Sequence, residues 1–541
     1  MLRSSSYPGT ITRSPEVGEA LEPSGGRAAR AAKGDHPRKP MTVSPNPPSP
    51  SVSTDGPAPL AGLGHRLLQV VSIVCLLHIP IGLGWVPFMQ HAWGYTLWLY
   101  LPNPVAWGLA AGVLLLVVPA SRSWALGWIE RVPLSPRLGW ALLLAMPLAI
   151  WPLRSRLAYG DSRILYYTMQ ADPSVFIFPD IGATFLLQAG FWAGHTSGVG
   201  GLEWAQASIV LCGPLFLYLL MRAARLLAPT TGTALFIVLL VVGCGSLRIF
   251  TGHLEVYSFV LVTTAAYAWS CLAFLRGECS WLAPALAFGF GLWVHVQFLF
   301  LGPSIMLLFV LAEPGRPLAH YLRRWVPAGL VCLAPTLVFF LALVVLGQHE
   351  ALEAAFAKAN RWSELGPDAR EEVWIRWWGG SGPGTLYMIF DRGHLKYLSN
   401  AFFLLAPWTG LVLLAFVLAR RRAFVASTEA RFLLSACIPM ALYAMLLRPV
   451  WGPYDWDLFS STAMFTGLLA GHLLVRELPD PPLRELALML VGSAILFVLI
   501  PFLIVGVAPA HKAGPFAHDF GRRVEGETLS ESFTRQIEPW L

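Results

Sequence analysis

Long apolar segments alternate with short polar ones along most of this chain. Apolar runs of about 16 to 24 residues recur from residue 67 to 507, and this is the length of an α-helix that crosses the hydrocarbon core of a bilayer. The predicted spans are 67–86, 105–120, 138–153, 203–226, 230–250, 258–275, 282–294, 298–312, 326–346, 398–419, 431–447, 459–475 and 486–507. The pattern predicts an all-α polytopic membrane protein with about 13 transmembrane helices and interfacial helices on its outer face.

The apolar stretch 282–312 decides the topology, because it reads either as one long tilted helix or as a hairpin whose tip lies near His295. The positive-inside rule favours the arrangement that collects the arginines on one side. Only the hairpin does so. The arginines that it collects are Arg222, Arg225, Arg276, Arg323, Arg324, Arg420, Arg421, Arg422 and Arg476. We therefore expect the hairpin. The chain is then a multi-pass protein of the bacterial plasma (inner) membrane, with its N-terminus on the cytoplasmic side.

Four regions differ in composition. Residues 1–62 are rich in Pro, Ser and Gly and lack a continuous apolar face, which predicts a disordered cytoplasmic tail. Residues 63–137 hold two additional N-terminal transmembrane helices, and 138–507 form the main transmembrane core. Residues 508–541 are an extracytoplasmic C-terminal tail under this topology.

Composition agrees with a membrane protein, since 55% of the residues are hydrophobic and only 13% are charged. The formal charge of +7 comes from the tail and from short arginine-rich loops. Such charge indicates orientation and attraction to anionic lipid, and no nucleic-acid partner is expected. The seven cysteines are scattered without metal-ligand spacing, which is typical of packing residues.

Four unusual segments share the predicted outer face: 159–163, 251–258, the long insert 347–397, and 451–460. Each carries acidic residues with aromatic neighbours. Acidic side chains at the edge of a membrane are rare enough to be a functional hypothesis by default.

The first segment, "YGDSR", holds Asp161 and Arg163 directly after a predicted span. Asp161 is a candidate functional carboxylate. The alternative is that it caps the short helix "DSRILYYTMQA", because Asp is a good N-cap residue.

The second segment, "TGHLEVYS", holds His253, Glu255 and Tyr257. His253 and Glu255 lie two residues apart, so a helix would not bring them to one face, whereas a turn can aim both at one cavity. The alternative is a solvated turn with Tyr257 in the interfacial aromatic belt.

The third and fourth segments supply further aromatic and acidic groups. In "GPYDWDLF", Asp455 and Asp457 alternate with the aromatic residues Tyr454 and Trp456, and alternate residues of an extended stretch point the same way. Such a pair suits a sugar or a divalent cation, and the alternative is a helix cap. The insert 347–397 is expected to hold an amphipathic helix in the interface, with Trp374, Trp377 and Trp378 inserted. The alternative is that these tryptophans stack on a sugar or a prenyl chain.

The apolar segment 174–195 is expected to lie in, or dip into, the outer leaflet, where it walls a cavity. The cations that can face a phosphate on this side are Arg163, Arg248, His295 and Arg448. Arg248 and Arg448 serve equally well as snorkelling anchors at span ends. His295 with Gln297 is a polar pair in an apolar setting, and its alternative is a satisfied buried histidine.

Residues 138–507 resemble the GT-C superfamily of integral-membrane glycosyltransferases, and within it the protein O-mannosyltransferase-like branch. "GDS" at 160–162, followed by an apolar outer helix and a proline, is similar to the first-loop signature of the family. "EVYS" at 255–258 is similar to a second recurrent motif. The resemblance implies that Asp161 is the catalytic base and that Glu255 is the second acid, near the donor.

The resemblance implies a transferase that moves a sugar from a polyprenyl-phosphate-linked donor to an acceptor glycan, lipid or protein at the outer face. Substrate-binding roles are expected for Arg163, His253, Tyr257, His295, Arg448, Tyr454, Asp455 and Asp457. No cofactor is expected to be required, and the question of a bound divalent cation stays open. The alternatives are a transporter or flippase for a lipid-linked envelope precursor, a non-catalytic scaffold for envelope assembly, and an O-antigen-ligase-like enzyme that relies on Arg and His more than on carboxylates.

Overall fold

The computed structural model describes residues 61–86, 92, 94–129, 131, 135–154, 162–171, 180–198, 200–348, 353, 392–447 and 452–507. No β-strand occurs among these residues. The first half of the described chain contains the helices α1 (Ala61–Gly82), η2 (Leu97–Tyr100), α2 (Asn103–Val117), α3 (Pro119–Ile129), α4 (Pro136–Ile150), η3 (Trp151–Leu153), α5 (Ser162–Ala171), α6 (Ile181–Ser197), α7 (Gly201–Leu227), α8 (Thr231–Val242), η4 (Gly245–Phe250) and α9 (Tyr257–Leu275). The second half contains α10 (Leu282–Val294), η5 (Val296–Leu301), α11 (Gly302–Ala312), α12 (Leu318–Val345), α15 (Arg392–Leu405), α16 (Thr409–Arg420), η6 (Arg421–Val425), α17 (Thr428–Leu446), η7 (Gly452–Phe459), α18 (Ser460–Glu477), α19 (Asp480–Ala494), η8 (Ile495–Leu499) and α20 (Ile500–Val507).

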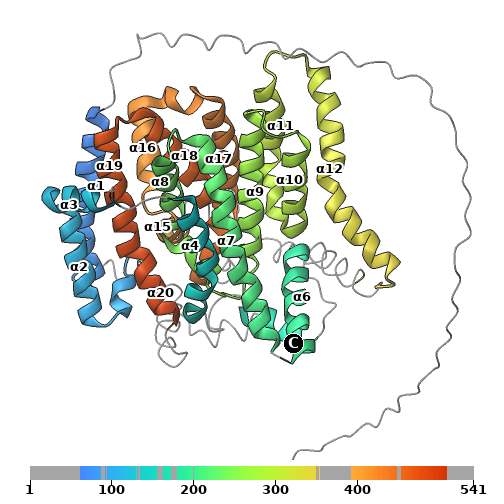
Figure 1. Ribbon diagram of the computed structural model, residues 1–541, viewed down its shortest axis with the longest axis horizontal. Coiled ribbons are helices and arrows are strands. Elements are labelled where there is room, and N and C mark those ends of the chain that lie inside the picture. The colour runs from blue at the N-terminus through green and yellow to red at the C-terminus, as the bar shows by residue number, and fades with distance from the viewer. Residues whose placement is uncertain are drawn as a thin grey trace, which may run out of the picture. The chain divides into compact units, whose positions relative to one another are not determined.

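The helices form a bundle with a membrane-spanning composition (Figure 1). Seven of the described helices are long and apolar enough to cross a bilayer, or up to nine if each of two bent pairs is one span. Four shorter apolar helices, Arg137–Leu153, Thr231–Val242, Leu282–Val294 and Val296–Ala312, fall at other predicted spans. The prediction of an all-α polytopic membrane protein is confirmed, and the count of about 13 spans stays a prediction.

Helix α18 is the centre of the bundle and α12 is its periphery. The apolar window of α18 is 94% buried, whereas that of α12 is 17% buried. Small residues allow the close packing at the centre: a Cβ on Gly467 or Gly471 of α18 would meet Val241 or Ile237 of α8 at 2.9 or 3.0 Å. Small residues at helix interfaces let backbones approach closely, as is common in membrane bundles.

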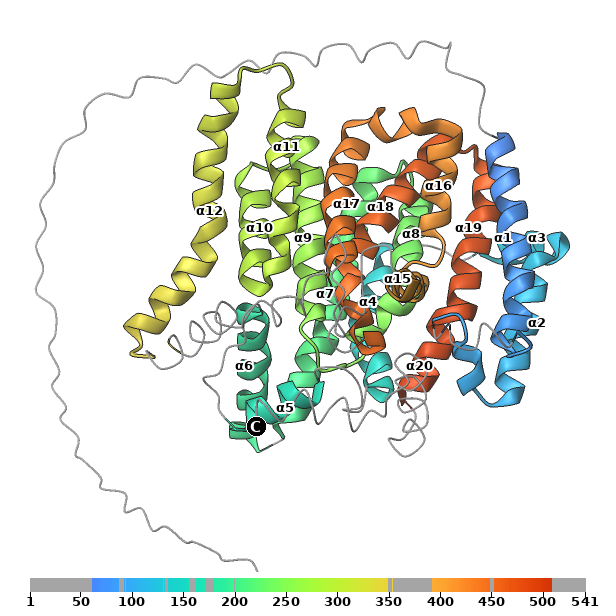
Figure 2. The ribbon, with the colours of Figure 1, turned by 180° about the vertical axis from the view of Figure 1, so that it is seen from behind.

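The stretch 282–312 is a hairpin, as the arginine pattern predicts. Helix α10 ends at Val294, His295 is extended, and α11 returns, so the connections before α10 and after α11 lie at the same end of the bundle (Figures 1 and 2). The Tyr267 hydroxyl of α9 lies 2.7 Å from that of Ser304, which fixes α11 against α9.

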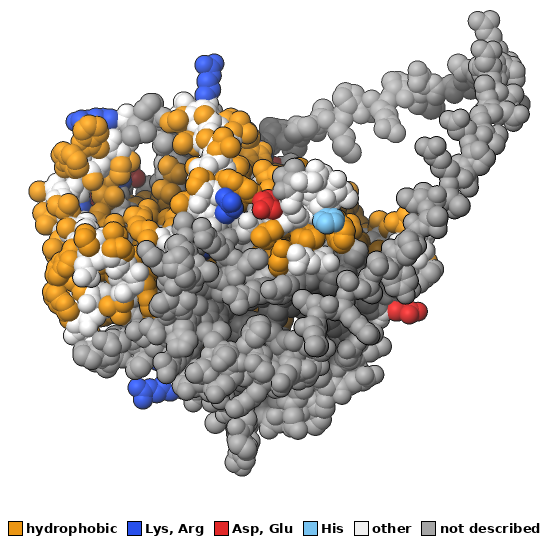
Figure 3. All heavy atoms as spheres, turned by 90° about the horizontal axis from the view of Figure 1, so that it is seen from below, with side chains coloured by type: hydrophobic (Ala, Val, Ile, Leu, Met, Phe, Trp, Pro, Cys, Tyr) orange, Lys and Arg blue, Asp and Glu red, His pale blue; other side chains and the backbone are white. Residues whose placement is uncertain are grey.

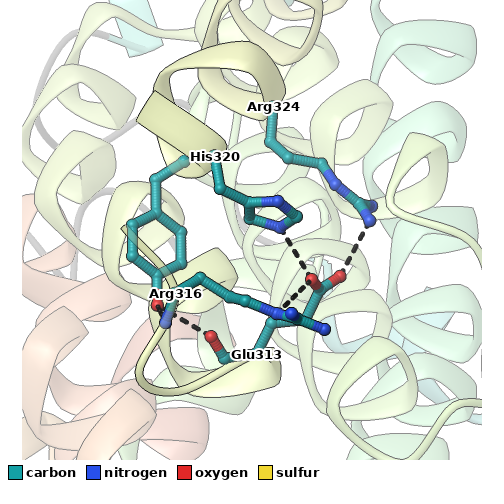
Figure 4. Close-up of polar contacts among 5 residues, drawn as sticks. Glu313, Arg316, His320 and Arg324 are labelled. Carbon is teal, nitrogen blue, oxygen red and sulfur yellow. Dashed lines mark hydrogen bonds and ion pairs between the residues drawn. The ribbon is translucent and has the colours of Figure 1, made fainter. Parts of the chain in front are cut away.

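The arginine-bearing connections meet at that same end, which we call the basic end. Arg276 contacts Glu429 at 2.9 Å and donates to the Leu226 carbonyl at 3.0 Å, so the ends of α9 and α7 adjoin the start of α17. Between α11 and α12, Glu313 accepts from Arg324 at 2.8 Å and lies 2.7 Å from His320 (Figure 4). These contacts hold the charges at one end of an apolar bundle.

The predicted span 398–419 is broken. Helix α15 and the helix that follows it meet at an angle of 103°, with the break between Leu405 and Thr409. A similar bend of 91° separates α2 from α3, within the predicted span 105–120. Pro119 and Pro407 stand at these two breaks, because proline cannot continue the backbone hydrogen bonding of a preceding helix.

Helix α6, in the predicted segment 174–195, packs along the first half of α7. A Cβ on Gly190 would lie 3.5 Å from the Cα of Ala205, and a Cβ on Gly182 would lie 2.6 Å from the carbonyl oxygen of Trp293 in α10. Helix α6 therefore sits beneath the tip of the α10–α11 hairpin (Figure 2).

Candidate functional site

The loop between η4 and α9 presents two of the candidate residues, His253 and Glu255. Gly252 has φ +66°, a left-handed conformation that favours glycine, and turns the chain here. The Gln206 side chain of α7 donates to the Gly252 carbonyl at 3.1 Å. A rigid transmembrane helix thus holds the loop in place.

Arg248 anchors the other side of this loop. Its guanidinium donates to the Leu153 carbonyl at 3.2 Å and to the Thr251 hydroxyl at 2.6 Å. The side chain is buried, with 2% of its surface exposed. Arg248 therefore connects η3 to the loop through buried hydrogen bonds. The interpretation of Arg248 as a snorkelling anchor is wrong, because its side chain does not reach the surface.

Asp457 enters from the 3₁₀ helix η7, which leads into α18. Its neighbour Trp456 packs edge-on against Phe502 with ring centroids 4.8 Å apart, and lies nearly parallel to the His253 ring at 6.5 Å. These aromatic contacts seat η7 against the loop of His253.

His253, Glu255 and Asp457 come together in one buried cluster, which we call the acidic cluster. Their metal-ligating atoms all lie within 4.8 Å of one another, and the His253 Nε2 is 3.7 Å from the Asp457 Oδ2. The three residues are 3%, 4% and 2% exposed. Within the described part of the chain, this is the one group of three or more His, Cys, Asp or Glu side chains that converge in this way.

The position of the cluster fits its charge. Glu255 and Asp457 lie just before the first turns of α9 and α18, where the positive ends of helix dipoles stabilise carboxylates. Burial, and then the charge of Arg248, lower the pKa of His253 from 6.5 to about 3. The imidazole is therefore neutral at physiological pH and keeps a lone pair.

The described side chains at this end of the bundle are mainly hydrophobic on the outside, with scattered single charges (Figure 3). The acidic cluster belongs to the interior instead. Because α9 and α18 begin at the cluster and end beside Arg276 and Arg476, the cluster and the basic end lie at opposite ends of the same two helices.

A second polar pair lies at the hairpin tip. The His295 Nδ1 accepts from the Gln297 backbone amide at 2.9 Å, which leaves the proton on Nε2, and Nε2 lies 2.8 Å from the Asp180 carboxylate. The Tyr257 ring is 5.8 Å from the His295 ring. His295 thus contacts the start of α6, and the Tyr257 ring lies beside the His295 ring.

Of the predicted site residues, the structure gathers His253, Glu255 and Asp457, and places Tyr257 beside His295. A turn aims His253 and Glu255 at one point, as the sequence allows. Asp161 and Arg448 lie outside the described residues, and so do the side chains of Arg163, Tyr454 and Asp455.

The prediction that Asp455 and Asp457 sit in an extended stretch is wrong. Residues Gly452–Phe459 form a 3₁₀ helix. With three residues per turn, positions two apart project in different directions, so alternation does not aim the two carboxylates the same way.

Three residues of the site were not predicted: Asp180, Gln206 and Trp456. Asp180 follows a proline and immediately precedes α6. An aspartate at this position is a typical signal for the start of a helix, so the sequence alone shows it. Gln206 lies inside a continuous apolar span, and its role depends on the Gly252 carbonyl, which is distant in sequence. No sequence signal marks that contact.

No protein-family model matches the chain, and no curated protein sequence matches it either. Among solved structures, the chain is similar to the crystal structure of ArnT from Cupriavidus metallidurans in the apo state, with a TM-score of 0.42 and 14% identity, covering 75% of this chain and 80% of that one. It is also similar to the structure of ArnT bound to undecaprenyl phosphate, with a TM-score of 0.44 and 15% identity over 76% and 80% of the chains. At this level of overlap, function has to be argued from the residues of the chain itself.

Proposed function

We propose that this chain is a membrane glycosyltransferase of the GT-C type, which transfers a sugar from a polyprenyl-phosphate-linked donor to an acceptor. The observation that carries the proposal is the acidic cluster. It lies at one end of an apolar helical bundle, at the starts of α9 and α18, opposite the basic end. A one-sided buried site suits chemistry on a substrate that arrives from the membrane and is processed at its surface.

The reaction is a single displacement. Asp161 accepts the proton of the acceptor hydroxyl while that oxygen attacks the anomeric carbon, and the bond from this carbon to the phosphate oxygen breaks. The electron pair leaves with the polyprenyl phosphate, and the anomeric centre is inverted. Assistance by a general base of this kind contributes about 10²–10⁴-fold.

Glu255 is the second catalytic acid in this proposal and lies near the donor. The remaining residues have binding roles: Asp457 accepts hydrogen bonds from sugar hydroxyls, and Tyr257 offers an aromatic face. The leaving phosphate needs a cation, and Arg163 and Arg448 are the candidates, since Arg248 and His295 already hold other groups.

The test is transfer of a radiolabelled sugar from a panel of polyprenyl-phosphate-linked sugars, in membranes that contain the full chain. We expect Asp161→Asn and Glu255→Gln each to lower the transfer rate by at least about 100-fold, as loss of a base or of a key acid does. Glu278→Gln is the matched control, because Glu278 is exposed just beyond the far end of α9. It should leave the rate unchanged.

Two outcomes would overturn this proposal. Absence of transfer by the wild-type chain with every donor of the panel is one. Full activity of Glu255→Gln is the other. Activity that survives Asp161→Asn, with loss of activity in Arg or His variants of the same face, would indicate an O-antigen-ligase-like enzyme.

A transporter or flippase is the second candidate, and a specific feature favours it. The α10–α11 hairpin is broken at His295, and a polar chain runs from its tip into the bundle: Gln297 donates to Ser461 at 3.2 Å, and the Ser461 hydroxyl lies 3.2 Å from that of Thr264. Broken helices with polar groups are common in transporters. Movement of a fluorescent polyprenyl phosphate lipid across proteoliposomes, without sugar transfer, would support this candidate.

A further inference from the structure

His253 presents a buried nitrogen that no hydrogen bond satisfies. Its Nε2 has no hydrogen-bond partner, although the side chain is only 3% exposed. The atom faces the Asp457 carboxylate at 3.7 Å, which is too long for a hydrogen bond. A buried polar atom without a partner is rare enough to require an explanation.

We propose that His253, Glu255 and Asp457 bind a divalent transition-metal ion, with Zn²⁺ as the preferred ion. The His253 Nε2 and one oxygen from each carboxylate are the three protein ligands. The inference concerns the same cluster as the proposed function, but it does not rest on the transfer reaction. The ion joins the loop before α9 to η7 before α18, and so ties the starts of two central helices together.

The distances suit a single ion. Zinc binds nitrogen and carboxylate oxygen at about 2.0–2.2 Å in tetrahedral geometry, which sets neighbouring ligand atoms roughly 3.4 Å apart. The observed His253–Asp457 separation is 3.7 Å, and all three ligand atoms lie within 4.8 Å of one another. Shifts of a few tenths of an ångström to about one ångström at the side-chain ends bring all three into the coordination range.

The donor set selects the class of ion. One imidazole with two carboxylates suits zinc and its neighbours, because Mg²⁺ and Ca²⁺ prefer oxygen ligands throughout. Three protein ligands leave a fourth position open, as in zinc sites that bind a water or a substrate oxygen.

Arg248 is an alternative to a metal ion as the source of positive charge near the Glu255 and Asp457 carboxylates. Its guanidinium is close enough to lower the pKa of His253 and supplies one positive charge to the neighbourhood of the cluster. Yet Arg248 leaves the lone pair of the His253 Nε2 without a donor. A metal ion supplies a partner for this nitrogen.

The experiment measures metal content and needs no substrate. The full chain, purified in detergent without chelator, is analysed by mass spectrometry for bound metals, and the apoprotein is then titrated with Zn²⁺ and with Co²⁺. We expect about one Zn²⁺ per chain and, with Co²⁺, the intense visible absorption of a tetrahedral site. His253→Ala and Asp457→Asn should each lower zinc affinity by at least about 100-fold, as the loss of a ligand or its orientation does.

His472→Ala is the matched control. His472 is also buried, but it lies near the basic end, where its ring contacts the Leu227 carbonyl and the Ser427 hydroxyl at 3.1 Å each. It should retain zinc. Wild-type protein that takes up neither Zn²⁺ nor Co²⁺, or Asp457→Asn and His253→Ala that bind as tightly as the wild type, would overturn the proposal.

The result is separable from the proposed function. Zinc bound at this cluster in a chain that transfers no sugar leaves the metal site standing and removes the transferase. Sugar transfer by a chain that binds no metal supports the transferase and overturns the metal site. Should His253→Ala fail to fold, Asp457→Asn and the Co²⁺ spectrum of the wild type still decide the question.

Discussion

At the scale of single residues, the acidic cluster carries a free-energy cost of burial that neighbouring groups have to offset. Two carboxylates and an imidazole are almost fully withdrawn from solvent. Burial of a charge is strongly unfavourable unless partners compensate it. The starts of α9 and α18 and the buried guanidinium of Arg248 contribute compensating positive charge. The loop therefore has to keep Arg248 in place.

Thr251→Val tests this support. Valine keeps the shape of threonine but removes the hydroxyl that accepts from Arg248 at 2.6 Å. A buried guanidinium that loses a partner destabilises the fold by about 1–3 kcal/mol. We expect the thermal unfolding temperature of the purified chain to fall, and transfer to fall with it because the loop of Glu255 loosens.

Thr263→Val is the control for this substitution. The Thr263 hydroxyl donates to the carbonyls of Phe259 and Val260 in its own helix, α9, at 3.0 and 2.9 Å. An equal change of the unfolding temperature in both variants would contradict a specific stabilising role for the contact between Thr251 and Arg248.

At the scale of elements, the contact between α6 and the hairpin tip depends on one glycine. Gly182 stands where α6 meets α10, and a Cβ there would lie 2.6 Å from the Trp293 carbonyl oxygen, which is backbone and cannot swing away. The same contact brings Asp180 to His295. Close approach of two helix backbones at this point thus aligns the second polar pair.

Gly182→Ala should push α6 away from the hairpin. Overpacking of this kind destabilises by about 1–3 kcal/mol. We expect a lower unfolding temperature and faster proteolysis near α6. Gly190→Ala, in the same helix, is the matched control, since its Cβ would meet its nearest neighbours at 3.5 Å, an ordinary contact. Equal stability of the two variants would contradict the close approach.

At the scale of the whole molecule, charge is divided between two ends. Arginine ion pairs hold one end, as between Arg276 and Glu429 or Arg420 and Glu477, and the acidic cluster lies at the other. The positive-inside rule then assigns the basic end to the cytoplasm and the acidic cluster to the extracytoplasmic side. This orientation is a prediction that the chain's own cysteines can test.

Cys279 is a natural probe of this orientation. It lies at the basic end between α9 and α10 and is partly exposed, whereas the other six cysteines are buried. We expect a membrane-impermeant maleimide to label it in inside-out vesicles and not in intact cells, and Cys279→Ser to abolish the labelling. Labelling in intact cells would reverse the topology.

The pH dependence of that labelling has a defined sign. Partial burial, and then the charge of Glu278, raise the pKa of the Cys279 thiol above its usual value. Because the thiolate is the reacting form, labelling should be slow at neutral pH and should accelerate as the pH rises.

The sequence by itself determined the helical membrane architecture, the hairpin at 282–312, and the candidacy of His253, Glu255 and Asp457. Apolar run length, arginine distribution and the rarity of acids at membrane edges are local signals, which the chain displays residue by residue.

The tertiary structure alone decided which of these groups meet. His253 and Asp457 are separated by some two hundred residues of chain, yet the packing of α9 beside α18 places them 3.7 Å apart. The 3₁₀ form of η7 and the pairing of His295 with Asp180 were equally invisible in the sequence. Each depends on contacts between helices that are distant in the chain, and helix packing, not local propensity, fixes those contacts.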